Sequence, residues 1–375
     1  MPPVQGKGLA VQVGEAMRTL WGVLLAVGVG LGAACGGQAS GAARGAAPAE
    51  GAPAVSAASP TPSPQPPIPI KAAFSAFSMS QIPLQIAKEA GYFAEEGLEA
   101  EVANIPGAAQ STAAMLAGDV QFLTTGGVGV IRARLAGSDL LLIGATKPYF
   151  AGAIMAQPAI TAAADLRGKR LAITNKGSNT DLMARAVLPR LGLTPDVDVT
   201  LISVGGEPQA VQAMIAGNVD ASSSTPPSDE RLRNLGMVTL FDVTAARIPY
   251  PATAIATTGT TLAQRPGVVE RYLRAYGRAV HRYLTDKEYV LRVAVEYLRS
   301  DDRAANEQAY EIERAHMQAN LELPIEAVQS TLDLIKAEDP RAAAAKPEEF
   351  VDLRAVHQLQ QEGFFDRLAS GTPTP

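Results

Sequence analysis

The chain contains GAAQSTAAMLAGDVQ at residues 107–121 and, 99 residues later, a similar stretch, GEPQAVQAMIAGNVD, at residues 206–220. Seven of the fifteen aligned positions are identical, without a gap. Each copy predicts a loop, one amphipathic helix that ends at a glycine, and a strand that begins with valine. We expect the methionine of each helix, Met115 and Met214, to pack in a core. The repeat therefore predicts two α/β units of similar layout, encoded in series.

The composition is that of a globular protein. The chain has 375 residues, of which 47% are hydrophobic and 18% charged. This length is sufficient for two cores. The net charge of −5, with no cluster of Lys and Arg, argues against a nucleic-acid partner.

An apolar block occupies residues 19–34 and is followed by the single cysteine, Cys35. The block is shorter than the roughly 20 apolar residues that span a membrane, so we expect a signal peptide over residues 1–35. Its end, LGAAC, resembles a bacterial lipoprotein box, with Cys35 as the lipidated first residue of the mature chain. Gly32 departs from that pattern, because leucine is usual three residues before the cysteine. An ordinary cleaved signal or an uncleaved anchor is the alternative, and a start at Met17 would give a more compact signal.

Residues 36–67 consist largely of Gly, Ala, Ser and Pro. Such a segment buries too little apolar surface to offset its ordering entropy, so we expect a disordered tether. Proline near its end would stiffen it.

Strands and helices are predicted to alternate through the folded body. Ser80 is expected to cap a helix over residues 81–90, with Pro83 in its first turn. Near-continuous apolar strands favour mostly parallel sheets that are covered on both faces. The expected strands cover residues 70–76, 98–103, 120–124, 140–145, 171–174, 199–204, 219–222, 238–241 and 252–257.

The last of these strands is expected to return the chain to the first unit. Residues 68–150 would then form the first part of lobe 1, and residues 151–250 would form lobe 2. The return and the C-terminal helices would cover residues 251–368, before a loose tail at 369–375. We expect helices over about 302–320, 325–337 and 351–362 within this last part.

Recognised catalytic patterns are missing from the sequence. The three histidines, His281, His316 and His357, fall in the C-terminal helices, far in sequence from the predicted cleft loops. The sequence has no metal-ligand spacing of Cys and His, no GxSxG elbow and no phosphate-binding loop. These observations predict a protein that is not an enzyme and needs no cofactor or metal.

Small polar residues gather in the loops that precede the predicted helices of both units. In open α/β sheets, ligands bind beyond the carboxyl ends of the strands, where helix N-termini present unpaired N–H groups. Several of these residues are equally explained as helix caps. The candidate ligand-binding residues are Phe77, Ser78, Met79, Ser80, Gln81, Thr125, Gly126, Gly127, Tyr149, Lys176, Gly177, Ser178, Asn179, Thr180, Ser224 and Thr225.

Four stretches carry a resemblance to a known family. They are IPLQIAKEAGYFAEEGLEAEV (82–102), GAAQSTAAMLAGDVQFLTTG (107–126), DLRGKRLAI (165–173) and PQAVQAMIAGNVDA (208–221). Together they resemble the solute-binding proteins of bacterial ABC importers, in the nitrate, sulfonate, taurine and thiamine-precursor group.

The resemblance implies a periplasmic-binding-protein type II fold, α/β, with two lobes that close by a hinge on a solute. It further implies an extracytoplasmic monomer that is lipid-anchored and delivers its solute to an ABC permease and its ATPase. A sulfonate-, pyrimidine- or flavin-like solute is expected. Lys147 and Lys176 are the available cations, and Phe77, Tyr149 and Phe150 the available rings.

Two alternatives remain at this point. One is a non-catalytic sensory module without a transporter. The other is an enzyme of the thiamine-pyrimidine synthesis type, whose family carries a Cys-rich metal motif that this sequence lacks.

Overall fold

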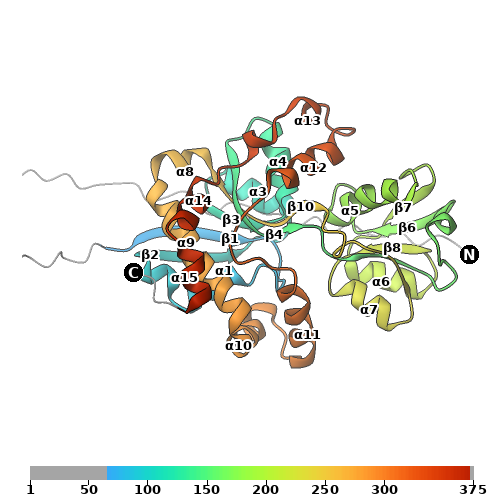
Figure 1. Cartoon of the computed structure of the whole chain (residues 1–375), viewed down its shortest axis with the longest axis horizontal. Coiled ribbons are helices and arrows are strands. Elements are labelled where there is room, and N and C mark those ends of the chain that lie inside the picture. The colour runs from blue at the N-terminus through green and yellow to red at the C-terminus, as the bar shows by residue number, and fades with distance from the viewer. Residues whose placement is uncertain (1–65, 372–375) are drawn as a thin grey trace, which may run out of the picture. The chain divides into compact units, whose positions relative to one another are not determined.

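Two five-stranded sheets organise the computed structural model, which describes residues 66–371 (Figure 1). The first sheet has the order β2-β1-β3-β10-β4, and the second has the order β7-β6-β8-β5-β9. The strands are β1 (Ile68–Phe74), β2 (Leu98–Asn104), β3 (Phe122–Thr125), β4 (Leu140–Tyr149), β5 (Ala153–Ala156), β6 (Lys169–Ile173), β7 (Val199–Ser203), β8 (Ala221–Ser224), β9 (Val238–Asp242) and β10 (Pro249–Thr258). The predicted signal peptide, Cys35, residues 36–65 of the tether and residues 372–375 lie outside the described residues.

The two sheets have matching strand directions. In the first, β1 pairs in parallel with β2 and β3, whereas β10 runs antiparallel to β3 and β4. In the second, β6 is parallel to β7 and β8, whereas β5 runs antiparallel to β8 and β9. Each sheet therefore has four strands in one direction and one opposed strand at the same place in the order. The α/β fold class is confirmed, and the sheets, expected to be mostly parallel, are mixed with one opposed strand each.

Helices cover these sheets. They are α1 (Pro83–Glu89), α2 (Tyr92–Glu95), α3 (Ala108–Leu116), α4 (Gly127–Leu135), α5 (Asn179–Val187), α6 (Glu207–Ile215), α7 (Ser228–Asn234), α8 (Gly259–Gln264), α9 (Pro266–Thr285), α10 (Lys287–Leu298), α11 (Arg303–Arg314), α12 (Ile325–Ile335), α13 (Arg341–Ala344), α14 (Arg354–Gln361) and α15 (Phe364–Ser370). Within residues 66–371, none of the helices combines the length and the apolar character needed to cross a membrane.

The repeated stretch forms the equivalent helices α3 and α6. Both are followed by a glycine with positive φ, 82° at Gly118 and 69° at Gly217, which is the backbone conformation that lets a helix end there. Met115 and Met214 are buried, as predicted. The repeat thus marks the same structural unit in each sheet.

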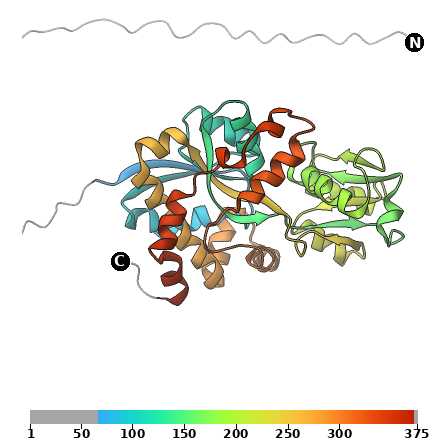
Figure 2. The same cartoon turned by 45° about the horizontal axis from the view of Figure 1, so that its top comes forward.

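The C-terminal helices gather around the first sheet (Figures 1 and 2). The 20-residue helix α9 contributes Tyr272, whose ring stacks 3.8 Å from that of Phe122 on β3. Helix α11 ends at Arg314, earlier than the predicted residue 320. Helix α15 continues to Ser370, inside the segment that we expected to be a loose tail.

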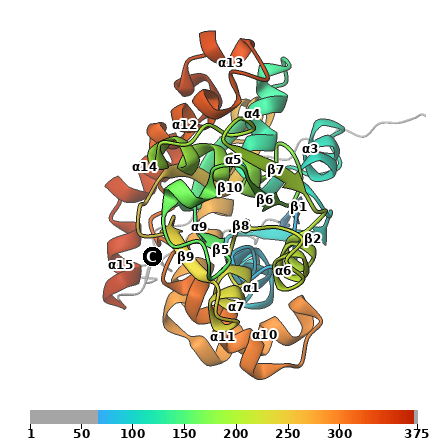
Figure 3. The ribbon, with the colours of Figure 1, turned by 90° about the vertical axis from the view of Figure 1, so that its right-hand side faces the viewer.

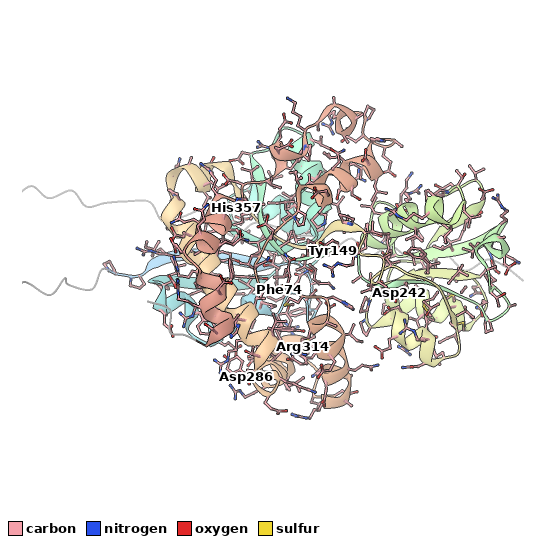
Figure 4. All side chains as sticks on the ribbon, in the orientation of Figure 1. Phe74, Tyr149, Asp242, Asp286, Arg314 and His357 are labelled. Atoms are coloured by element: carbon pink, nitrogen blue, oxygen red, sulfur yellow. The ribbon has the colours of Figure 1, made fainter. Side chains whose placement is uncertain are left out.

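Two short segments connect the sheets, one from β4 to β5 and the other from β9 to β10. The ring of Phe150 in the first segment stacks on Tyr250, at the start of β10, with 3.8 Å between centroids and 7° between planes. The Phe150 N–H also donates to the carbonyl of Ile248 at 3.0 Å. Tyr149 and Asp242, labelled in Figure 4, mark the points where the chain leaves each sheet. The short strand β5 was not predicted, because its four apolar residues carry no periodic signal.

Helix α6 begins at Glu207, and the carboxylate of Glu207 accepts hydrogen bonds from the loop after β8. Its Oε1 accepts from the N–H of Thr225 at 3.1 Å and from the Thr225 hydroxyl at 2.7 Å. Burial raises the pKa of Glu207, although hydrogen bonds from Thr225 and Ser228 oppose this, and nearby Asp229 raises it further. The pKa of Asp229 is itself raised by burial. The ionised form of Glu207 therefore costs stability in the folded chain.

We predict that Gly152→Ala strongly destabilises the protein. Gly152 has a φ of 130°, and an added Cβ would collide with the backbone carbonyl of Ser224. The expected loss in the free energy of unfolding is about 3 kcal/mol or more, measured by denaturant unfolding. Gly168→Ala is the control, because Gly168 also has positive φ but open space around its Cα. It should cost about 1–2 kcal/mol, and equal losses in the two variants would contradict the proposed clash.

A second prediction concerns pH. A carboxyl whose pKa is raised on folding adds stability below its unfolded pKa, and this stability is lost as the pH rises through the folded value. Glu207→Gln keeps a carbonyl oxygen for Thr225 and removes the charge. The melting temperature of Glu207→Gln minus that of the wild type should therefore be more positive at pH 7.5 than at pH 4. Glu101→Gln, at an exposed position, is the control. If the melting-temperature difference between Glu207→Gln and the wild type stays constant or falls as the pH rises, the raised pKa of Glu207 is refuted.

Candidate functional site

The loop after β1 is folded by a single side chain, that of Gln81. Its Oε1 accepts from the N–H groups of Ser75 at 2.9 Å and Ala76 at 3.2 Å. Ser80 does not cap α1 as predicted, because the helix begins at Pro83 and Ile82 precedes it without a side-chain cap. The Ser80 hydroxyl instead lies 3.0 Å from that of Ser78.

An aromatic cluster fixes Phe77 at the tip of this loop. Its ring lies edge-on to Phe74, at 5.3 Å, and to Tyr297 of α10, at 5.6 Å. The Tyr297 hydroxyl also donates to the carbonyl of Ala76 at 3.1 Å, which ties α10 to the loop. The guanidinium of Arg299 lies 5.0 Å from the Phe77 ring. Phe77 nevertheless stays 41% exposed, as expected for a residue on the wall of an open space.

A cavity of about 200 Å³ lies beside Phe77. It brings together the loop after β1, the loop after β8, and the helices α10 and α11. Figure 3 shows α10 and α11 on the same side of the molecule as α7, which follows the β8 loop. The lining residues are Phe77, Ser78, Met79, Pro226, Pro227, Leu298, Ala309, Ile312 and Glu313. The cavity therefore lies between the loops of the first sheet and those of the second.

Lys147 forms a buried ion pair at this cavity. Its Nζ donates to Oε2 of the lining residue Glu313 at 2.6 Å, and both side chains are less than a tenth exposed. His316 follows nearby, and burial together with the charge of Lys147 lowers its pKa. The positive charge of Lys147 is thus compensated by the carboxylate of Glu313, and Lys147 is not an unpaired cation that could bind an anionic ligand.

Lys176, the other predicted cation, lies elsewhere. Its side chain is 73% exposed and its Nζ is 3.9 Å from Glu338, which also accepts from Arg132 of α4 at 2.9 Å. This arrangement connects the loop after β6 to elements of the first lobe. It does not place Lys176 in the lining of the cavity.

Most of the remaining polar candidates form hydrogen bonds within the loop or strand to which they belong. Ser178 caps α5 by accepting from the N–H of Asp181, and Thr174 binds both Ser178 and Thr180. Asn179 Oδ1 and Thr125 Oγ1 are buried without hydrogen-bond partners among residues 66–371. The Ser224 hydroxyl lies 2.9 Å from that of Ser222.

The glycines and Tyr149 also have local roles. Gly127 packs so tightly on β10 that a Cβ there would lie 2.6 Å from Cγ of Pro251, and the neighbouring Gly126 precedes α4. The positive φ of Gly177, 76°, turns the loop before α5. The Arg247 guanidinium lies 4.2 Å from the centre of the Tyr149 ring.

The structure therefore places Phe77, Ser78 and Met79, among the predicted residues, in the lining of the cavity. The candidates from the sequence did not include Pro226, Pro227, Leu298 or the three lining residues on α11. Ala309, Ile312 and Glu313 have the i, i+3, i+4 spacing that puts residues on one helix face, and this was the available signal. Among residues 66–371, no group of three or more His, Cys, Asp or Glu side chains could hold a metal ion.

Solved structures with this fold include binding proteins and an enzyme. The periplasmic aliphatic sulphonate binding protein SsuA from Escherichia coli is 18% identical, with a TM-score of 0.66, and the match covers 76% of this chain and 92% of that one. SsuA from Xanthomonas axonopodis pv. citri, bound to MOPS, is 20% identical, with a TM-score of 0.60 and coverage of 77% and 100%. The desulfurization enzyme DSZB is 18% identical, with a TM-score of 0.57 and coverage of 78% and 99%.

These likenesses establish the periplasmic-binding-protein fold. No curated protein matches the chain in sequence. The family model described as NMT1/THI5 like matches residues 78–288, which is more than half of the chain. The chain therefore belongs to the NMT1/THI5-like family.

Proposed function

We propose that this protein is an extracytoplasmic solute-binding protein of an ABC import system, which captures a small organic solute between its two lobes. The observation that carries the proposal is the cavity, whose lining comes from the loops after β1 and β8. A solute bound there would contact both lobes at once. Hinge closure on it would give a shape that a permease could recognise.

Exposed ion pairs join the lobes outside the connecting segments, beside the apolar packing of α12 near α5. Glu338 holds Arg132 and lies near Lys176, and all three side chains are partly or largely exposed. Exposed ion pairs of this kind contribute roughly 0–1 kcal/mol, so they can break at little cost.

The size of the cavity limits the solute. At the packing density of protein interiors, about 0.74, a space of about 200 Å³ holds roughly ten non-hydrogen atoms. A pyrimidine ring or a short sulfonate fits this volume, whereas a flavin ring system would extend beyond it. We therefore favour the smaller members of the solutes that the sequence suggested.

Binding without chemistry is the favoured reading of the lining. Its polar side chains are Ser78 and Glu313, and Glu313 is held by Lys147. The lining has no histidine, cysteine or lysine, and its two groups that could act as nucleophile or base, Ser78 and Glu313, are engaged with Ser80 and Lys147. The likeness to DSZB makes an enzyme the second candidate, and turnover of a bound solute by the purified protein would favour it.

A screen of solutes tests the proposed function. Sulfonates, nitrate, pyrimidines and flavins are added to the purified chain, and the melting temperature is measured. A ligand at 100 times its Kd should stabilise the folded state by about 2.7 kcal/mol, which raises the melting temperature by several degrees. If native mass spectrometry and the thermal screen both fail to find any bound solute, the proposal is wrong.

Phe77→Ala should weaken binding of any solute found in that screen by about tenfold, because it removes apolar wall area worth roughly 1.5–3 kcal/mol when fully covered. Calorimetry gives the two affinities. Leu116→Ala is the matched control, since Leu116 is 52% exposed on α3 and does not line the cavity. Equal affinities of Phe77→Ala and wild type would place the site elsewhere.

Lipid anchoring at Cys35 is part of the proposal and has its own test. A lipidated cysteine would hold the protein at the outer face of the membrane, and the tether would let the body reach a permease. Cys35→Ser should move the protein from the membrane fraction to the soluble fraction, as judged by blotting. Retention in the membrane fraction would mean that an uncleaved apolar segment anchors it.

A further inference from the structure

The wall of the cavity is largely apolar, and its only charged group is a carboxylate. Seven of the nine lining residues carry apolar side chains, and the other two are Ser78 and Glu313. We propose, taking the solute-binding function as given, that the cavity selects a small uncharged solute with an apolar body and one hydrogen-bond donor, and that Glu313 accepts that hydrogen bond.

Glu313 has an acceptor to offer. Its Oε2 is occupied by the Lys147 ammonium at 2.6 Å, whereas the described residues make no hydrogen bond to Oε1. The side chain is 9% exposed, so its position is fixed by packing and by the ion pair. A donor on the solute would meet a charged acceptor, and hydrogen bonds to charged groups are stronger than those between neutral groups.

The same wall is unfavourable for an anion. The one charged lining residue is the carboxylate of Glu313, which repels an anion, and no Lys, Arg or His lines the cavity. The Arg299 guanidinium lies outside the lining, 5.0 Å from the Phe77 ring. The Ser78 hydroxyl is engaged with that of Ser80. The charge of Lys147 is compensated by Glu313 itself. A buried anion here would lose its hydration without gaining a cation, which is costly.

A cationic solute gains little either. Lys147 Nζ lies 2.6 Å from the carboxylate, so the two charges largely compensate each other. The carboxylate therefore acts on a solute as a nearby hydrogen-bond acceptor and not as a net negative charge. This distinguishes an alcohol, amide or ring N–H from an ammonium group.

Some residues that line the cavity lie outside residues 78–288, the segment that matches the family model. The family model matches residues 78–288, whereas Leu298 lies at the end of α10, and Ala309, Ile312 and Glu313 lie on α11. Solute choice by these helices can therefore differ from that of relatives that share the two sheets.

Three probes of similar size test the inference on the purified full chain. Benzyl alcohol and anisole are isomers with the same ring, but only the alcohol has a donor, and benzenesulfonate carries an anion. Binding is measured by calorimetry or by ligand-observed NMR. Benzyl alcohol should bind about tenfold more tightly than anisole, and benzenesulfonate should bind most weakly.

Two variants assign the preference to Glu313. Glu313→Gln removes the negative charge and leaves Lys147 uncompensated, so benzenesulfonate should gain at least about tenfold in affinity. The double variant Lys147→Met/Glu313→Met replaces the ion pair by apolar side chains, a change that buried pairs often tolerate. It should bind benzyl alcohol and anisole equally well. Glu311→Gln, at an exposed position on α11, should change no affinity.

The outcomes separate this inference from the proposed function. A wild type that prefers benzenesulfonate, or a preference for the alcohol that survives in the double variant, overturns the role of Glu313 while leaving solute binding intact. Failure of all three probes at millimolar concentration also overturns it, because each is close in size to the cavity. If Glu313→Gln does not fold, the double variant decides.

Discussion

The stacking of Phe150 on Tyr250 joins the two places at which the chain passes between its sheets. The ring centroids are 3.8 Å apart, and a backbone hydrogen bond from Phe150 to Ile248 lies beside them, so the two segments are packed against each other. The cavity depends on this constraint, because its lining comes from loops of both sheets. Gly152 completes the junction by letting one segment approach the carbonyl of Ser224, which leaves no room for a side chain.

The repeat made much of the fold predictable from the sequence. A helix that ends at glycine is a local event, set by backbone conformation, and so residues 107–121 and 206–220 could be read directly. The return of β10 to the first sheet followed from its apolar run. The antiparallel β5 could not be predicted, because four apolar residues fit a helix or a strand equally well and only pairing with β8 and β9 decides between them.

The candidate site was less predictable, for a physical reason. Loop composition located Phe77, Ser78 and Met79, but the opposite wall on α11 depends on how that helix packs. The sequence of an amphipathic helix indicates which of its residues share a face, but it does not indicate which cavity that face will line. Ser80 is a second example of a role that depends on the fold. Serine is a common helix cap, but α1 begins at Pro83, and the side-chain amide of Gln81 accepts from the N–H of Ser75 in the loop before it.

Charge pairing over long sequence separations changes what the two candidate lysines can do. Lys147 pairs with Glu313, 166 residues later, and Lys176 lies near Glu338. The first pair is buried, so breaking it leaves a costly isolated charge; the second is exposed and weak. A buried anion is stabilised by a cation that is not already paired, whereas here the carboxylate of Glu313 on α11 pairs with Lys147. In the proposed site, the loops of both sheets would hold the solute, and the carboxylate of Glu313 on α11 would decide which chemistry the wall accepts.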